Sequence, residues 1–264
     1  MRKNGLIIAG FDPSAGAGLL MDIKVFSAIG VYAFAVPTAL VEENTDMVHG
    51  MTGIKPSVLK GQIDILLDHA PVAGVKIGML CDKSTARLVG KILSSRRLTN
   101  IVLDPVLVSS SGDPLLRGSR KDSIHELLPL CTVVTPNIPE ASVLSGITIR
   151  TRNDMLRAAQ YFMSRGTAAV VIKGGHFSEK GLDLYMDRRR HVFLKAHPLH
   201  KDVHGTGCIL SSAITAYLID GYDTLDAVRK AKHFAYSALR YSRPVSPSLH
   251  RSVASPGVIR QAND

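Results

Sequence analysis

Short apolar runs alternate with amphipathic stretches along the whole 264-residue chain. Most of the apolar runs are continuous, which is typical of parallel strands that are covered on both faces. We expect such strands at residues 6–9, 34–41, 74–77, 100–103, 132–135 and 168–172. We expect helices between them at residues 19–29, 56–68, 83–93, 123–128 and 153–165, and two longer helices at 205–219 and 225–241. This alternation predicts an α/β protein with a doubly wound, parallel sheet.

Two segments near the C-terminus depart from this pattern. Residues 183–186 and 192–194 are short apolar runs separated by a charged turn, which predicts a hairpin. Residues 243–264 are basic, contain several Pro and Ser residues and lack periodicity, so we expect a loose tail. Because no internal repeat or linker is present, the chain is predicted to form one domain over residues 1–242, followed by that tail.

Composition narrows the class of protein. With 45% hydrophobic residues the chain is expected to fold, and no apolar run has the length of about 18 to 20 residues that a membrane helix needs. The apolar run at residues 6–9 is too short for a secretory signal, so we expect a cytoplasmic protein.

The chain has three cysteines, Cys81, Cys131 and Cys208. Their odd number and the lack of C-x-x-C spacing predict neither a disulfide framework nor a zinc site. The net charge of +10 favours acidic partners, namely nucleic acid, an anionic membrane or phosphorylated small molecules.

In an open parallel sheet, ligands bind where the carboxyl ends of strands lead into helices, so the loops after the strands carry the candidate chemistry. The first such loop, residues 10–18, is rich in glycine and precedes a helix, which suits a bound anion or a tight turn. A dinucleotide-binding G-x-G-x-x-G fingerprint would need glycine where Met21 stands, and no Walker loop is present. The sequence therefore disfavours a dehydrogenase and a P-loop enzyme.

A second glycine-rich segment begins the helix at 205–219. Gly205, Thr206 and Gly207 direct several backbone amides to one point, which suits a phosphate or a developing phosphoryl charge. Cys208 follows in the first turn, where the positive end of the helix is expected to lower its thiol pKa. A structural cysteine in a glycine-rich helix start is the alternative.

Three further loops place charged groups at the same edge of the predicted sheet. Asn137 and Glu140 are spaced to bind Mg²⁺ through water, or to cap a helix. Lys173 can neutralise phosphate oxygens, or it is simply a solvated loop cation. Asp104 adds a carboxylate that can bind Mg²⁺, or it is simply a turn residue. Phosphoryl transfer needs acids that bind Mg²⁺, a cation, a cradle for the phosphate and a group that activates the nucleophile. The loops at this edge of the predicted sheet supply all four.

The sequence closely resembles the hydroxymethylpyrimidine and phosphomethylpyrimidine kinases of thiamine biosynthesis, which belong to the ribokinase-like superfamily. The resemblance runs in order from about residue 6 to about residue 239. The segments that carry it are residues 10–18, 22–24, 27–32, 38–40, 44–45, 76–80, 104–106, 111–113, 135–141, 173–176 and 204–208.

This resemblance implies a three-layer α/β/α ribokinase-like fold with a mainly parallel sheet, and a homodimer. It implies an enzyme that uses ATP and Mg²⁺ to phosphorylate the hydroxymethyl group of an aminopyrimidine, and then the resulting monophosphate. Cys208 would be the catalytic base, and the amides of Gly205, Thr206 and Gly207 would stabilise the transferring phosphoryl group.

The resemblance also implies roles for the other candidate residues. Lys173, with Asn137 and Thr206, would bind ATP, while Asp104 and Glu140 would organise the metal. The residues expected near the pyrimidine are Gly10, Asp12, Glu43 and Met79.

Glu43 stands where the family usually has Gln. A carboxylate accepts hydrogen bonds but does not donate them, so Glu43 pairs best with a protonated ring nitrogen or reads a different ring. A pyridoxal or pyridoxine kinase of the same fold is therefore the alternative enzyme. A catalytically silent ligand-binding relative and a nucleic-acid-binding protein are the others, and the latter is disfavoured because the chain has no Trp and no recognition motif.

Overall fold

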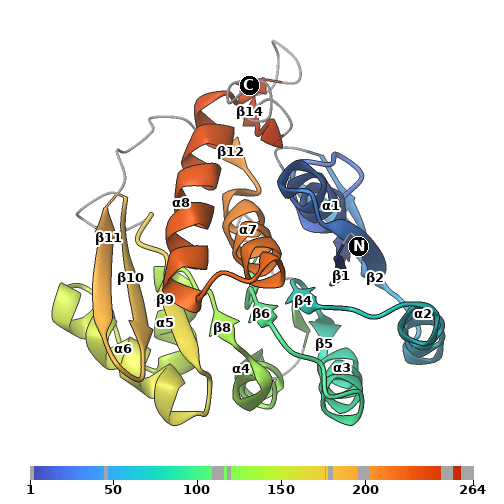
Figure 1. Ribbon diagram of the computed structural model, residues 1–264, viewed down its shortest axis with the longest axis horizontal. Helices are drawn as coiled ribbons and strands as arrows, with labels where there is room; N and C mark the ends of the chain where they lie inside the picture. The colour runs from blue at the N-terminus through green and yellow to red at the C-terminus, as the bar shows by residue number, and fades with distance from the viewer. Residues whose placement is uncertain are drawn as a thin grey trace.

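A nine-stranded sheet with helices on both faces forms the body of the protein (Figure 1). The computed structural model describes residues 3–44, 47–108, 116–117, 120–175, 177, 181–195, 203–244 and 252–256. The strand order is β11-β10-β9-β8-β6-β4-β1-β2-β3. Its strands are β1 (Asn4–Phe11), β2 (Tyr32–Glu43), β3 (Val48–Gly53), β4 (Gly74–Ile77), β6 (Ile101–Leu103), β8 (Val133–Val134), β9 (Ala169–Ile172), β10 (Leu182–Asp187) and β11 (His191–Lys195). The helices are α1 (Gly18–Ile29), α2 (Pro56–His69), α3 (Lys83–Ser95), α4 (Arg120–His125), α5 (Ile138–Ser145), α6 (Arg152–Ser164), α7 (Thr206–Asp220) and α8 (Thr224–Arg240).

The helices divide into two layers. Helices α2 to α6 pack on one face of the sheet, and α1, α7 and α8 pack on the other (Figure 1). The alternation of β1 follows this division, since Leu6 and Ile8 face the first layer while Ile7 and Ala9 face the second. The strands from β2 to β9 across the centre pair in parallel, and β3, β10 and β11 are antiparallel. The three-layer, mainly parallel fold and the C-terminal hairpin are therefore confirmed.

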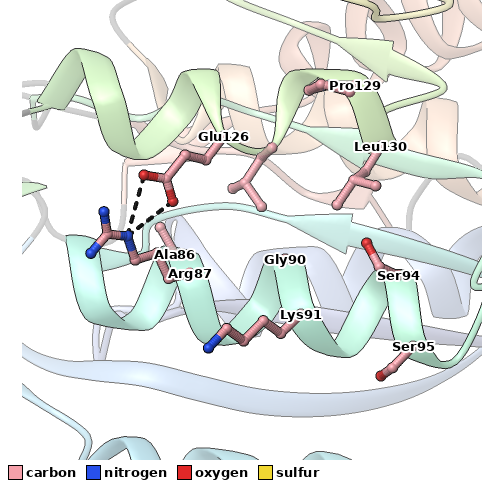
Figure 2. A pocket seen from close by; sticks show the side chains of 10 residues that line it. Ala86, Arg87, Gly90, Lys91, Ser94, Ser95, Glu126, Pro129 and Leu130 are labelled. Carbon is pink, nitrogen blue, oxygen red and sulfur yellow. Dashed lines mark hydrogen bonds and ion pairs between the residues drawn. The ribbon is translucent and has the colours of Figure 1, made fainter.

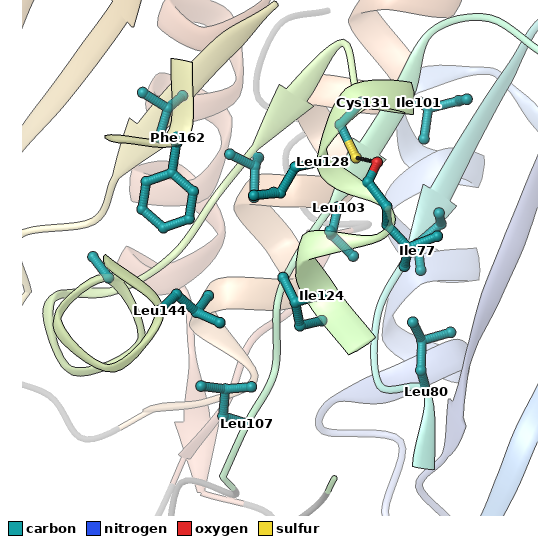
Figure 3. Packing of buried hydrophobic residues seen from close by; sticks show 14 of the residues in the cluster. Ile77, Leu80, Ile101, Leu103, Leu107, Ile124, Leu128, Cys131, Leu144 and Phe162 are labelled. Carbon is teal, nitrogen blue, oxygen red and sulfur yellow. Dashed lines mark hydrogen bonds between the residues drawn. The ribbon is translucent and has the colours of Figure 1, made fainter. Parts of the chain in front are cut away.

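The larger core lies between the sheet and the α2 to α6 layer, and its buried side chains include Leu103 of β6, Leu128, Leu144 and Phe162 (Figure 3). The Cys131 thiol is buried in this core and donates to the carbonyl of Leu127 at 3.2 Å. None of the three cysteines, all of which lie in the described part of the chain, forms a disulfide. Within the described ranges, no helix combines the length and the apolar character needed to cross a bilayer.

Several elements differ from the sequence expectation, among them a two-stranded sheet of β5 (Cys81–Asp82) and β7 (Leu116–Arg117). β3 is an additional antiparallel strand at the sheet edge, beside β2. The segment expected as a helix at 123–128 is the end of α4 followed by a 3₁₀ turn over Leu128–Leu130. α5 is absent from the predicted helices, although a helix cap at Asn137 was one of the alternatives.

The segment after residue 242 contains regular structure, contrary to the expected loose tail. β13 (Arg243–Pro244) and β14 (Ser252–Val253) form a small sheet with β12 (Val203–His204), the strand that leads into α7. Ala254 is buried in the core formed by α7 and α8. Pairing with a distant strand holds these two-residue strands, which is why periodicity does not reveal them. The domain boundary at 242 remains a prediction.

Removing residues 250–264 is expected to expose the amides of β12 to solvent. Hydrogen exchange measured by mass spectrometry should be faster at residues 203–205 than in the full chain, because β14 supplies their pairing. Removing only residues 258–264 is the matched control and should leave this exchange unchanged. Equal exchange in both truncations would contradict a holding role for β14.

Candidate functional site

A buried ion pair lies at the carboxyl edge of the sheet. Asp104 follows β6 and Lys173 follows β9, and Lys173 Nζ donates to Asp104 Oδ1 at 2.7 Å. Thr135, directly after the intervening β8, donates to the same carboxylate oxygen at 3.3 Å. Parallel strands end at the same edge, so three residues far apart in sequence meet here.

Both members of this pair are held in their charged forms. Burial opposes ionisation of Asp104, but the positive charges of Lys173 and Lys76 outweigh it, and the pKa of Asp104 is lowered. Burial likewise opposes the charge of Lys173, while Asp104 and Glu140 outweigh it and raise its pKa. The edge of the sheet therefore carries a fixed cation beside a fixed anion.

The glycine-rich start of α7 lies against this pair. A Cβ added to Gly207 would be 3.0 Å from Lys173 Nζ and 3.4 Å from Asp104 Oδ2. Thr206 and Gly207 occupy the first turn of α7, whose free amides and positive dipole end favour an anion. The cation and the helix end together form a cradle suited to phosphate.

Gly205 allows the first glycine-rich loop to approach this cradle. It caps α7 with a φ of 80°, and a Cβ at this position would lie 2.0 Å from the carbonyl oxygen of Gly16. Only glycine combines this backbone conformation with so close an approach. The two loops that the sequence singled out are therefore in contact.

Cys208 lies between the two loops, and its thiol differs from the sequence expectation. The backbone amide of Gly18 lies near its sulfur and favours the thiolate. The helix start was expected to lower the thiol pKa, but burial raises the pKa of Cys208 to about 12, against the opposing effects of Lys76 and the Gly18 amide. That prediction is wrong because the cost of burying a thiolate exceeds the stabilisation from one helix end.

Asn137 and Glu140 form a capping box at the start of α5. The Asn137 side chain accepts from the Glu140 amide and the Glu140 carboxylate accepts from the Asn137 amide, each at 2.8 Å. Asn137 also pairs with Lys173 in an isolated parallel bridge. Burial raises the pKa of Glu140 to about 7, with Lys173 opposing the rise. Asn137 and Glu140 therefore cap α5, as the alternative prediction states, and Asn137 lies beside Lys173 of the phosphate cradle.

The residues expected at the pyrimidine lie at the ends of β1, β2 and β4. A Cβ on Gly10 would be 3.1 Å from the Met79 sulfur, so these two residues line the same spot. The Asp12 carboxylate accepts from the amides of Ser14 and Ala17 at 2.7 and 2.8 Å, and so shapes the first loop. Glu43 is half-buried at the end of β2.

An exposed groove elsewhere on the protein contains none of the predicted site residues. It lies between α3 and the segment from α4 to the 3₁₀ turn (Figure 2). Across it, Arg87 Nε donates to Glu126 Oε2 at 3.1 Å. The candidate chemistry is at the sheet edge and not in this groove.

Comparison with known proteins identifies the family. The sequence profile of phosphomethylpyrimidine kinases matches residues 12–252. The chain belongs to this kinase family. It is 39% identical to the hydroxymethylpyrimidine/phosphomethylpyrimidine kinase of Aquifex aeolicus, over 90% of this chain and 94% of the relative.

Solved structures of ribokinase-like kinases share the fold. An ADP complex of Bacillus subtilis pyridoxal kinase has a TM-score of 0.91 and 31% identity, covering 98% of this chain and 99% of that one. The phosphomethylpyrimidine kinase of Clostridium difficile has a TM-score of 0.82 and 34% identity, covering 90% and 100%. Within the segments that suggested this kinase family, Thr45, Ser111 to Asp113 and His176 lie outside the described residues.

Three buried residues of this kinase have no role that the sequence predicts. Lys76 of β4, Asp22 of α1 and Ser212 of α7 are each completely buried. A signal was available, since a lysine inside an apolar strand is almost never fully buried without a partner. The partner, however, comes from another part of the chain.

Proposed function

We propose that this kinase transfers the γ-phosphoryl group of ATP to the hydroxymethyl group of 4-amino-5-hydroxymethyl-2-methylpyrimidine, and then phosphorylates the monophosphate, in thiamine biosynthesis. The observation that carries the proposal is the Lys173–Asp104 pair set against the glycine-rich start of α7. This arrangement offers a cation and converging amides to a polyphosphate. The Aquifex relative is named for both phosphorylation activities.

In the proposed reaction, the substrate hydroxyl oxygen attacks the γ-phosphorus and ADP leaves with the bridging oxygen. Lys173 and the amides of Gly205, Thr206 and Gly207 stabilise the charge on the transferring phosphoryl oxygens. Cys208, once deprotonated, accepts the hydroxyl proton. Gly10 and Met79 contact the ring, and Asp12 keeps the first loop in shape. Asn137 and Thr206 line the nucleotide side.

Mg²⁺ fits this site as a companion of the nucleotide rather than as a resident ion. Among the described residues, no group of three or more His, Cys, Asp or Glu side chains is placed to hold a metal. Mg²⁺ needs only one or two carboxylates when water and phosphates supply its other ligands. Asp104 is ionised at the cradle and Glu140 lies nearby, so these two would orient the ion. Bound there, Mg²⁺ would neutralise phosphate charge.

Assembly as a homodimer and a location in the cytoplasm complete the proposal. Exposed apolar side chains on β2 and α2 offer apolar area that self-association would remove from water. Tyr32, Leu40, Val58 and Ile65 are between 48% and 71% exposed.

A parallel assay with ATP tests the substrate. The pyrimidine alcohol, its monophosphate, pyridoxal and pyridoxine are supplied separately, and ADP release and the phosphorylated product are measured. We expect turnover of the pyrimidine alcohol and its monophosphate. Phosphorylation of the pyridine compounds alone would instead establish a pyridoxal kinase, the second candidate, which the similarity to the Bacillus subtilis enzyme favours.

Replacing Glu43 with Gln is expected to increase kcat/KM for the neutral aminopyrimidine relative to pyridoxal by about 3- to 10-fold, the value of one hydrogen bond. The amide can both donate to a ring nitrogen and accept from the amino group, whereas the carboxylate only accepts. Steady-state kinetics with both substrates provide the measurement. Glu42→Gln is the matched control, since Glu42 is an exposed neighbour on the same strand. An unchanged ratio in Glu43→Gln would remove this residue from ring recognition.

A further inference from the structure

Three polar side chains meet in the interior beneath the candidate site. Lys76 Nζ donates to Asp22 Oδ2 at 2.6 Å, and Ser212 Oγ donates to Asp22 Oδ1 at 2.7 Å. All three residues are completely buried. Desolvating two charges is expensive, and apolar residues often replace such a pair without loss of stability. Stability alone is therefore a weak reason for a buried ion pair.

The position of Lys76 follows from the alternation of β4. Val75 and Ile77 face the core on the α2 to α6 side, so Lys76 between them faces α1 and α7. On the adjacent β1, Ile7 and Ala9 occupy the same face as ordinary apolar residues. An apolar side chain would thus continue the surrounding core.

Each member of the cluster is close in sequence to a different segment of the site. Lys76 precedes Gly78 by two residues, and a Cβ on Gly78 would lie 2.8 Å from Lys76 Nζ, so the amine supports the backbone that leads to Met79. Asp22 lies one helical turn after Gly18, whose amide lies near the thiol of Cys208. Ser212 lies four residues after Cys208, which puts both on the same face of α7.

We propose that Asp22, Lys76 and Ser212 position the first glycine-rich loop, the Gly78–Met79 segment and Cys208 relative to one another. The cluster joins α1, α7 and β4 at the point where each element meets the site. These are positioning residues, because none of them needs to touch the substrate. The effect on turnover rests on the proposed kinase function, whereas the effect on local order does not.

A double substitution separates positioning from folding. In Asp22→Leu/Lys76→Met both charges are removed, so no unpaired charge is left in the interior. We expect an unfolding midpoint close to that of the wild type, a KM for ATP within about twofold, and a kcat at least about 10-fold lower, since small displacements of reacting groups cost large factors in rate. Lys60→Met/Asp64→Leu, which removes an exposed ion pair of α2, is the matched control and should keep the wild-type kcat. A folded Asp22→Leu/Lys76→Met enzyme with wild-type kcat would overturn the proposal.

Ser212→Ala tests the same cluster without altering charge. We expect a kcat about 3- to 10-fold lower, together with a lower unfolding midpoint, because the buried Asp22 carboxylate loses one hydrogen bond. Hydrogen exchange should become faster at residues 16–19 and 205–209, and this readout holds whatever the substrate is. If the double variant fails to fold, unchanged exchange and unchanged kcat in Ser212→Ala would still refute the positioning role. Absence of kinase activity in the wild type would count against the proposed function, while the exchange result would still decide the positioning.

Discussion

Replacing Cys208 with alanine is expected to lower kcat about 100-fold or more while leaving ATP affinity nearly unchanged. A general base contributes roughly 10² to 10⁴ in rate, and the Cys208 thiol lies in the first turn of α7, near the Gly18 amide. Turnover is measured in steady state and affinity by titration with a non-hydrolysable ATP analogue. Cys131→Ala is the matched control, because it removes another buried thiol remote from the site. Unchanged turnover in Cys208→Ala would remove this residue from the mechanism.

The pH dependence of kcat tests whether Cys208 acts as a base. With a pKa of about 12 the thiol is neutral at pH 7, and only about one molecule in 10⁵ carries the thiolate. A base must be deprotonated to act, so the sign is fixed: wild-type kcat should rise by about tenfold per unit between pH 7 and 9. The Cys208→Ala enzyme should lack this rise. A flat wild-type profile combined with a large loss in the alanine variant would assign the thiol a hydrogen-bonding role instead.

The central strands and the helices could be predicted because their signals are local. The run at residues 74–77 is predicted as a strand from its β-branched residues Val75 and Ile77, and it is β4, in which all four residues are buried. β3 was missed because Val48–Gly53 contains two glycines and lies at the sheet edge, where it needs no continuous apolar run. β12 and β14 were missed because each has only two residues and depends on its distant partner.

The chemistry at the sheet edge could be predicted in outline from topology. Asp104 and Lys173 were expected at one edge because parallel strands end together, and their side chains do form a pair. The thiol pKa of Cys208 was predicted with the wrong sign, since the helix end can be recognised in the sequence but the burial by packed loops cannot. The partnership of Lys76 and Asp22 was missed for the same reason, because 54 positions separate two residues that only the folded chain brings together.

Replacing Gly205 with alanine is expected to lower kcat by about 10² to 10³, the loss typical of removing one preorganised donor to a developing oxyanion. The substitution places a Cβ 2.0 Å from the Gly16 carbonyl oxygen, so one of the two loops must move. Either movement displaces the amides at the start of α7 from Lys173. ATP binding should weaken together with turnover, unlike in Cys208→Ala.

Gly221→Ala provides the matched control for this substitution. Gly221 caps the other end of α7 with a φ of 104°, so alanine there carries a similar conformational strain of about 1 to 2 kcal/mol. Among the described residues, its Cβ would meet only the Lys3 amine, at 3.9 Å. Both variants should therefore lose stability in thermal unfolding, while only Gly205→Ala should lose turnover. Equal kcat values in the two variants would show that the close contact between the loops does not shape the phosphate cradle.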